Sequence, residues 1–102
     1  MTRRPLGLVY NPAAGDGRWR RPSLDSVRRA LEAAGGEVEM FATRAPGDGV
    51  EQTRLAASRH DLVAVHGGDG SINEAFNGIV ASGRSPQVLL LPGGTIDRKS
   101  VV

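Results

Sequence analysis

The stretch that decides the fold is Asp61–Asn77, which reads DLVAVHGGDGSINEAFN. It opens with an apolar run, Leu62–Val65, of the kind that forms a strand buried on both faces of a parallel sheet. A glycine-rich break, His66–Gly70, follows the run, and Ser71 then offers a helix N-cap. The stretch therefore predicts a strand, a glycine loop and a helix in direct succession.

The helix is predicted from apolar residues that recur every three or four positions, which places them on one face. These residues are Ile72, Ala75, Phe76, Ile79 and Val80. We expect Gly83 to end the helix, because glycine is the usual residue just past a helix C-terminus.

The chemistry that suits such a loop is phosphate binding. Glycines let the backbone come close to a ligand, and a helix start offers unpaired N–H groups at the positive end of the macrodipole. Asp69 is unusual there, so we expect its carboxylate to shape the loop by accepting N–H bonds, or to contact Mg²⁺ through water. Asn73 and Glu74 can reach back to the same loop. The alternative is a tight packing turn without a ligand, which would need fewer glycines.

The rest of the chain repeats the pattern of strand and helix. Predicted strands cover residues 6–10, 37–42, 62–65 and 87–91, and the first two helices cover a segment capped by Ser23 and stopped by Gly35, and residues 50–58. The order βαβαβαβ with short connections predicts a three-layer α/β/α sandwich with a mostly parallel four-stranded sheet. The loops at Asn11, Thr43, Gly67 and Gly93 should then gather at the carboxyl edge of the sheet, where ligands of such folds bind.

Composition narrows the functional classes. The 102 residues allow one domain with a modest, aliphatic core, since aromatic residues make up only 4%. With no cysteine and no apolar run long enough to span a bilayer, we expect a cytoplasmic protein without disulfides. The net charge is +2 and basic residues are not interleaved with aromatic ones, which disfavours nucleic acid as a partner. Neither the dinucleotide pattern G-x-G-x-x-G nor the P-loop pattern fits these glycines.

Four segments in this order resemble the diacylglycerol kinase catalytic domain family, which includes bacterial lipid kinases and sphingosine kinases. They are residues 11–15 (NPAAG), 43–48 (TRAPGD), 67–74 (GGDGSINE) and 92–95 (PGGT). The resemblance covers residues 6–95, and its most specific part is the third segment with Asn77-Gly78 beyond it. It implies the fold shared with the more distant NAD kinases. It also implies phosphorylation of a lipid hydroxyl, of diacylglycerol or a related lipid, by Mg-ATP, with peripheral association at a membrane surface.

Carried over position by position, the resemblance implies a set of nucleotide contacts. These are Asn11, Thr43, Gly67, Gly68, Asp69, Gly70, Ser71, Ile72, Asn73 and Thr95. The family's catalytic base and principal metal ligands belong to a second, β-rich domain, so no catalytic residue is expected here, and Asp69 is a candidate only for an outer-sphere contact with Mg²⁺. His60 and His66 are expected to be packing or loop residues.

The chain departs from the family pattern after Thr95, where relatives continue with a small residue and Asn-Asp-Phe-Ala. We therefore expect residues 1–95 to be a truncated ATP-binding domain and residues 96–102 to be a non-native tail, because Asp97–Val102 matches what a sequencing adapter encodes in one frame. The alternative is a divergent native C-terminus. Such a fragment should lack lipid kinase activity and be poorly soluble, with apolar surface and a sheet edge exposed. Two other functional hypotheses are an NAD kinase-like fragment and a free-standing nucleotide-binding module.

Overall fold

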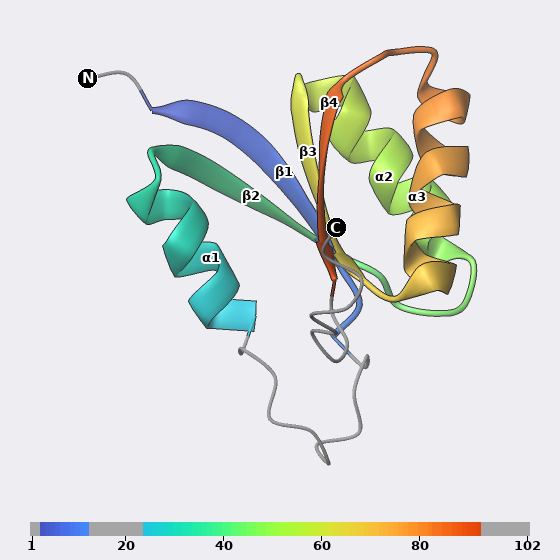
Figure 1. The fold of residues 1–102 in the computed structure, drawn as a ribbon. Helices are drawn as coiled ribbons and strands as arrows, with labels where there is room; N and C mark the ends of the chain where they lie inside the picture. Colours follow the sequence, from blue (N-terminus) through green and yellow to red (C-terminus); the bar gives the residue numbers. More distant parts are fainter. Residues whose placement is uncertain (1–2, 13–23, 93–102) are drawn as a thin grey trace, which may run out of the picture.

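The fold is a parallel β-sheet between two helical layers (Figure 1). A computed structural model describes residues 3–12 and 24–92. Its elements are β1 (Arg4–Tyr10), α1 (Leu24–Ala33), β2 (Gly36–Ala42), α2 (Asp48–Arg59), β3 (Leu62–Gly67), α3 (Asp69–Ser82) and β4 (Gln87–Pro92). Helix α1 covers one face of the sheet, and α2 and α3 lie side by side on the other. The predicted three-layer sandwich is confirmed. The predicted Ser23 cap, Gly93, Thr95 and the 96–102 tail lie outside the described residues.

The strand order is β2-β1-β3-β4, with every pair parallel. From β1 the chain moves outward to β2, and from β2 it crosses back over β1 to β3. The direction of winding therefore reverses between β1 and β3, which is the topological switch point of the sheet. Tyr10 pairs with His66 in the register of these two strands, so β1 and β3 end at the same level.

The core consists of one cluster on each face of the sheet. The face under α2 and α3 holds Val9, Phe41, Ala56, Ala57, Val63, Val65 and Ala75, and the face under α1 holds Leu6, Leu8 and Ala64. Strand β3 contributes to both clusters, which explains its unbroken apolar sequence. Phe41 is the one aromatic side chain among the buried core residues that the structure describes, as the aromatic-poor composition suggests.

The apolar face predicted for α3 is partly wrong. Ala75 is buried and Ile72 and Ile79 pack against the core, but Phe76 is 48% exposed and Val80 is 80% exposed. The reason is that α3 packs sideways on α2, where Gly78 lies against the backbone of that helix. The buried stripe is therefore rotated away from Phe76 and Val80.

The edge strand β4 is also open to solvent. Leu89 and Leu90, which point to opposite faces of the sheet, are 39% and 42% exposed. The apolar surface and the sheet edge that we expected to be exposed are therefore present within the described part of the chain. None of the described helices combines the length and the apolar character needed to cross a bilayer.

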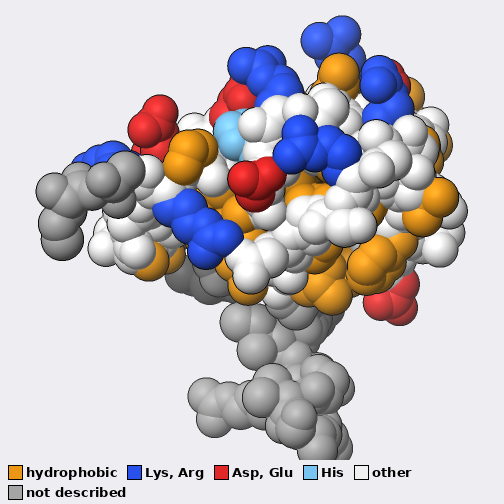
Figure 2. All heavy atoms as spheres, turned by 90° about the horizontal axis from the view of Figure 1, so that it is seen from above, with side chains coloured by type: hydrophobic (Ala, Val, Ile, Leu, Met, Phe, Trp, Pro, Cys, Tyr) orange, Lys and Arg blue, Asp and Glu red, His pale blue; other side chains and the backbone are white. Residues whose placement is uncertain are grey.

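Charged side chains of both signs occupy the amino-terminal edge of the sheet. Figure 2 looks onto this end of the molecule and shows Arg side chains with acidic ones between them. Arg84 pairs with Asp61 at 2.8 Å, and Arg59 pairs with Glu39 at 3.0 Å. Glu39 also contacts His60 Nε2 at 2.7 Å, and the His60 ring meets Phe41 edge to face. The prediction that His60 is a packing residue is confirmed.

Candidate functional site

The turn from β3 into α3 is tighter than the sequence predicts. Strand β3 runs to Gly67 and α3 begins at Asp69, so Gly68 alone connects them. The N–H of Ile72 donates to the Gly68 carbonyl oxygen at 3.0 Å, which makes Gly68 the N-cap. The predicted five-residue loop and the predicted Ser71 cap are therefore wrong, because the backbone carbonyl of Gly68 starts the helix and Ser71 lies inside its first turn.

The three glycines of this turn have different structural roles. A Cβ on Gly67 would come within 2.5 Å of Ser71 Cβ and 2.6 Å of Ser71 Oγ, so Gly67 makes room for the helix. A Cβ on Gly68 or Gly70 would meet no atom of the described residues within 4 Å, and neither residue has a positive φ. Among the described residues, packing therefore requires glycine only at position 67, and Gly68 and Gly70 are required neither by packing nor by a positive φ, although an N-cap such as Gly68 also favours glycine.

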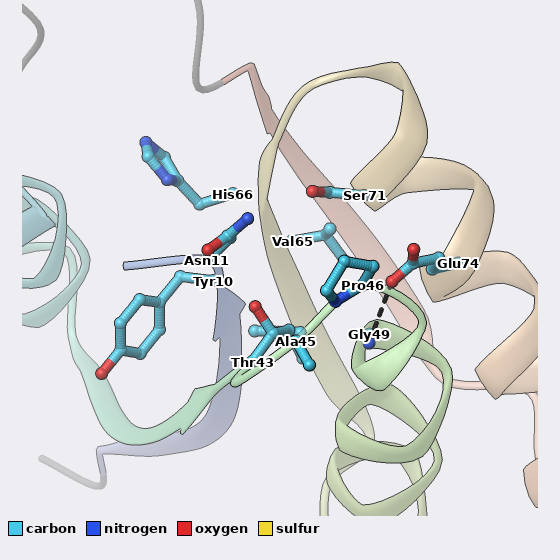
Figure 3. Close-up of a pocket in the computed structure, with 11 residues that line it drawn as sticks. Tyr10, Asn11, Thr43, Ala45, Pro46, Gly49, Val65, His66, Ser71 and Glu74 are labelled. Carbon is cyan, nitrogen blue, oxygen red and sulfur yellow. Dashed lines mark hydrogen bonds between the residues drawn. The ribbon is translucent and has the colours of Figure 1, made fainter. Parts of the chain in front are cut away.

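A pocket with a volume of about 60 Å³ opens at the carboxyl edge of the sheet, beside the switch point (Figure 3). Its lining comes from the ends of β1 and β3, the connection between β2 and α2, and the first turns of α2 and α3. The lining residues are Val9, Tyr10, Asn11, Thr43, Ala45, Pro46, Gly49, Val65, His66, Ser71 and Glu74. A shallower groove shares six of these residues and extends past Arg44 and Gly70.

The structure brings together some of the predicted contact residues and separates others. Asn11, Thr43 and Ser71 line the pocket, and Gly70 lines the adjoining groove. The remaining described candidates do not line either: Gly68, Asp69 and Asn73 are exposed around the start of α3, Gly67 is buried in the turn, and Ile72 packs against the core.

The role that we predicted for Asp69 as a shaper of the loop is wrong. Among the described residues, no N–H group donates to its carboxylate, which lies exposed in the first turn of α3. Two other turns at this edge are held by ordinary bonds: Thr43 N–H donates to the Tyr10 carbonyl oxygen at 2.8 Å, and Arg44 N–H donates to Asp48 Oδ2 at 2.9 Å. Asp69 remains favourably placed for the helix macrodipole.

Glu74 is the site residue whose role the sequence did not reveal. We predicted that its carboxylate reaches back to the glycine turn before α3, but it reaches the start of α2 instead. Oε1 accepts from Gly49 N–H at 2.9 Å and Oε2 accepts from Gly47 N–H at 3.2 Å. Figure 3 draws the Gly49 bond as a dashed line. The partners lie 25 and 27 residues earlier in the chain, so no local pattern could have indicated them.

Two of the helices that start at this edge, α2 and α3, therefore differ. N–H groups at the start of α2 face the Glu74 carboxylate, whereas α3 begins at Gly68 with no cap from a side chain of the described residues. Orphan N–H groups at a helix start attract anions when no internal group satisfies them. The start of α3, flanked by Gly68 and Gly70, is the side of the pocket that suits a phosphate.

The described residues do not form a metal centre. No three His, Cys, Asp or Glu side chains within residues 3–12 and 24–92 are grouped closely enough to hold an ion.

His66 lines the pocket from the end of β3, next to Asn11 (Figure 3). Its place at the carboxyl end of a central strand was the sequence signal for this.

Comparison with known proteins gives the same family throughout. The diacylglycerol kinase from Staphylococcus carnosus is 33% identical over 93% of this chain, and that from Staphylococcus haemolyticus is 35% identical over 88%. The crystal structure of a diacylglycerol kinase from Bacillus anthracis superimposes on 90% of the chain with a TM-score of 0.69 at 31% identity, and a second structure from that organism on 93% with a TM-score of 0.76.

The chain spans only about a third of each of these proteins: 31% and 27% of the two staphylococcal kinases, and 33% and 32% of the two Bacillus chains. The family description "Diacylglycerol kinase catalytic domain" matches residues 5–101, nearly the whole sequence. The chain therefore belongs to the diacylglycerol kinase catalytic domain family.

Proposed function

We propose that this chain is the ATP-binding part of a lipid kinase and that it binds the nucleotide phosphates at the start of α3. The observation that carries the proposal is the pair Gly68 and Gly70. Within residues 3–12 and 24–92, neither glycine is required by packing or by a positive φ, and both flank a helix start that no side chain caps, beside a pocket. A ligand whose phosphates approach the backbone closely gives these glycines a reason.

The other polar groups of the pocket complete a plausible contact set. Asn11 and Thr43 face the space in front of α3 from the ends of β1 and β2, and Ser71 brings a hydroxyl from the helix itself. Bound Mg²⁺ would neutralise charge between the phosphates. The described residues offer no cluster of ligands for Mg²⁺. Asp69 is the candidate for a contact with this ion through water.

The acceptor that we propose is a lipid hydroxyl, of diacylglycerol or a related lipid, reached by peripheral association with a membrane. The support is the family and the relatives named diacylglycerol kinase. Phosphoryl transfer also needs a positioned nucleophile and a metal-held phosphate group, which the described residues do not supply together. We therefore expect no transfer of labelled phosphate from ATP to diacylglycerol micelles by these 102 residues, and clear turnover would contradict this assignment of roles.

The nucleotide assignment is tested by following backbone amide signals during a Mg-ATP titration. The expected result is that signals of Gly68, Gly70 and Ser71 shift together with those of Asn11 and Thr43. Signals at the opposite edge of the sheet, such as those of Asp61 and Arg84, serve as the control and should stay in place. Shifts confined to that opposite edge, or no shifts at millimolar nucleotide, would overturn the proposal.

A further inference from the structure

Glu74 connects two parts of the pocket that are far apart in the sequence. It stands in α3 one turn after Ser71, and its carboxylate accepts N–H bonds from Gly47 and Gly49 at the start of α2. A Cβ on Gly49 would overlap the Glu74 side chain, so the carboxylate is packed directly on the α2 backbone. Gly49 is itself buried, and Glu74 is half-buried. This contact is therefore a fitted joint between the helices, unlike the exposed ion pairs on the surface.

The segment that Glu74 holds is a wall of the pocket. This wall, residues 43–46, connects β2 with α2 and contributes Thr43, Ala45 and Pro46 to the lining. At one end Thr43 N–H donates to the Tyr10 carbonyl oxygen, which ties the wall to β1. At the other end the bonds from Gly47 and Gly49 tie it to α3 through Glu74. The distance between Thr43 and the start of α3 thus depends on this carboxylate.

We propose that Glu74 is a positioning residue for nucleotide binding, an inference that rests on the proposed function. By its two bonds it fixes the wall at residues 43–46 opposite the phosphate-binding turn. Its negative charge also satisfies the N-terminus of α2, so of these two helix starts only that of α3 is left open to a phosphate by the described side chains. Glu74 acts through the wall and needs no contact with the nucleotide.

The test combines local amide exchange with nucleotide affinity in Glu74→Gln and Glu74→Ala. Hydrogen exchange of the Gly47 and Gly49 amides reports the joint, and calorimetric titration of Mg-ATP well below the unfolding temperature reports binding. We expect exchange at both amides to accelerate at least about tenfold and the Kd to rise about tenfold, the effect of losing a charge-assisted hydrogen bond. Glu74→Gln keeps the shape of the side chain and serves where Glu74→Ala fails to fold.

Two control variants separate positioning from general effects. Glu51→Gln removes a carboxylate from the first turn of α2, where it pairs with Arg54 on the surface, and should change neither quantity. Ala75→Gly lowers stability at the neighbouring position of α3 without touching the joint, and should leave the Kd unchanged. Unchanged exchange in both Glu74 variants, or faster exchange with an unchanged Kd, would overturn the role of Glu74. Absence of Mg-ATP binding in the wild type would instead overturn the proposed function.

Discussion

At the scale of single residues, Gly68 and Gly70 are the physical reason to expect a ligand. Glycine inside a helix costs about 0.5–1 kcal/mol relative to alanine. Gly70 lies in the first turn of α3, where an added Cβ would meet no described residue within 4 Å. Gly67 is the opposite case, because Ser71 occupies the space that a side chain there would need. The glycines of this motif therefore have different roles. Gly67 lets α3 start close to β3, and Gly68 and Gly70 leave the solvent side of the helix start free of side chains of their own.

This difference gives a paired prediction. Gly70→Ala should raise the free energy of unfolding by up to about 1 kcal/mol and at the same time weaken Mg-ATP binding, because the methyl group enters the space that we assign to phosphate. Gly67→Ala should lower the free energy of unfolding by about 1–3 kcal/mol through overpacking on Ser71. Urea unfolding and calorimetric titration of both variants measure the two effects. A Gly70→Ala protein that is more stable and binds Mg-ATP as the wild type does would remove the functional reason for that glycine.

The sequence could identify this motif but could not sort its members. Three glycines, an acid and a hydroxyl in a short turn indicate a ligand site from the sequence alone. Which glycine makes room for Ser71 depends on where α3 starts, and the start is set by the Gly68 carbonyl instead of a side-chain cap. The bonds of Glu74 depend on how α3 lies against α2, which is a property of the tertiary fold.

At the scale of elements, the contact between α2 and α3 organises this side of the sheet. Gly78 of α3 faces the Val50 carbonyl oxygen and Thr53 of α2, and a Cβ at that position would overlap both. Thr53 is fully buried at this contact. The close approach brings the first turns of the two helices together, which is what allows Glu74 to reach Gly47 and Gly49.

Gly78→Ala should therefore destabilise the protein, although alanine is the better helix former. The new methyl group meets a backbone carbonyl that cannot move aside without shifting the helix, so we expect a loss of about 1–3 kcal/mol in the free energy of unfolding. The matched control is Asn77→Ala at the neighbouring exposed position, where the change should stay within about 0.5 kcal/mol. Thermal unfolding of both variants measures the difference. Equal stability of the two would show that α2 and α3 can separate freely.

The order and type of the elements could be predicted, whereas their starts and buried faces could not. Periodicity located all four strands, but α2 starts at Asp48 instead of residue 50. That start receives its carboxylate from Glu74, which a local search for capping residues does not consider. The buried stripe of α3 was misplaced for a similar reason, since Gly78 turns the helix toward α2 and leaves Phe76 outside.

At the scale of the whole molecule, large apolar side chains are exposed on α3 and on the edge strand β4. Val80 on α3 and Leu89 and Leu90 on the edge strand are all open to solvent. Val80→Lys should reduce self-association measured by size-exclusion chromatography, because it places a charge in this surface. It should leave the free energy of unfolding within about 0.5 kcal/mol of the wild type, since the side chain is 80% exposed. Stronger association, or a clear loss of stability, would mean that Val80 is covered in solution.

The central claim for the whole molecule is that the switch point between β1 and β3 forms a nucleotide site. Winding in opposite directions from these strands leaves a crevice at their carboxyl ends, and the described pocket lies there. Helix α3 starts at this crevice, and no side chain of the described residues caps its N-terminus. Sheet topology, pocket and helix start thus coincide at one place.

Calorimetric titration of Mg-ATP into the wild type and Gly68→Val tests this claim most directly. Gly68 is exposed with φ −87° and ψ −166°, a conformation that valine adopts, and a Cβ there would lie clear of every described residue. The variant should fold, with a cost on the order of 1 kcal/mol for the poorer N-cap. We expect binding heat for the wild type and none for a folded Gly68→Val at the same concentrations. Equal heats for the two proteins would contradict a nucleotide site at the start of α3.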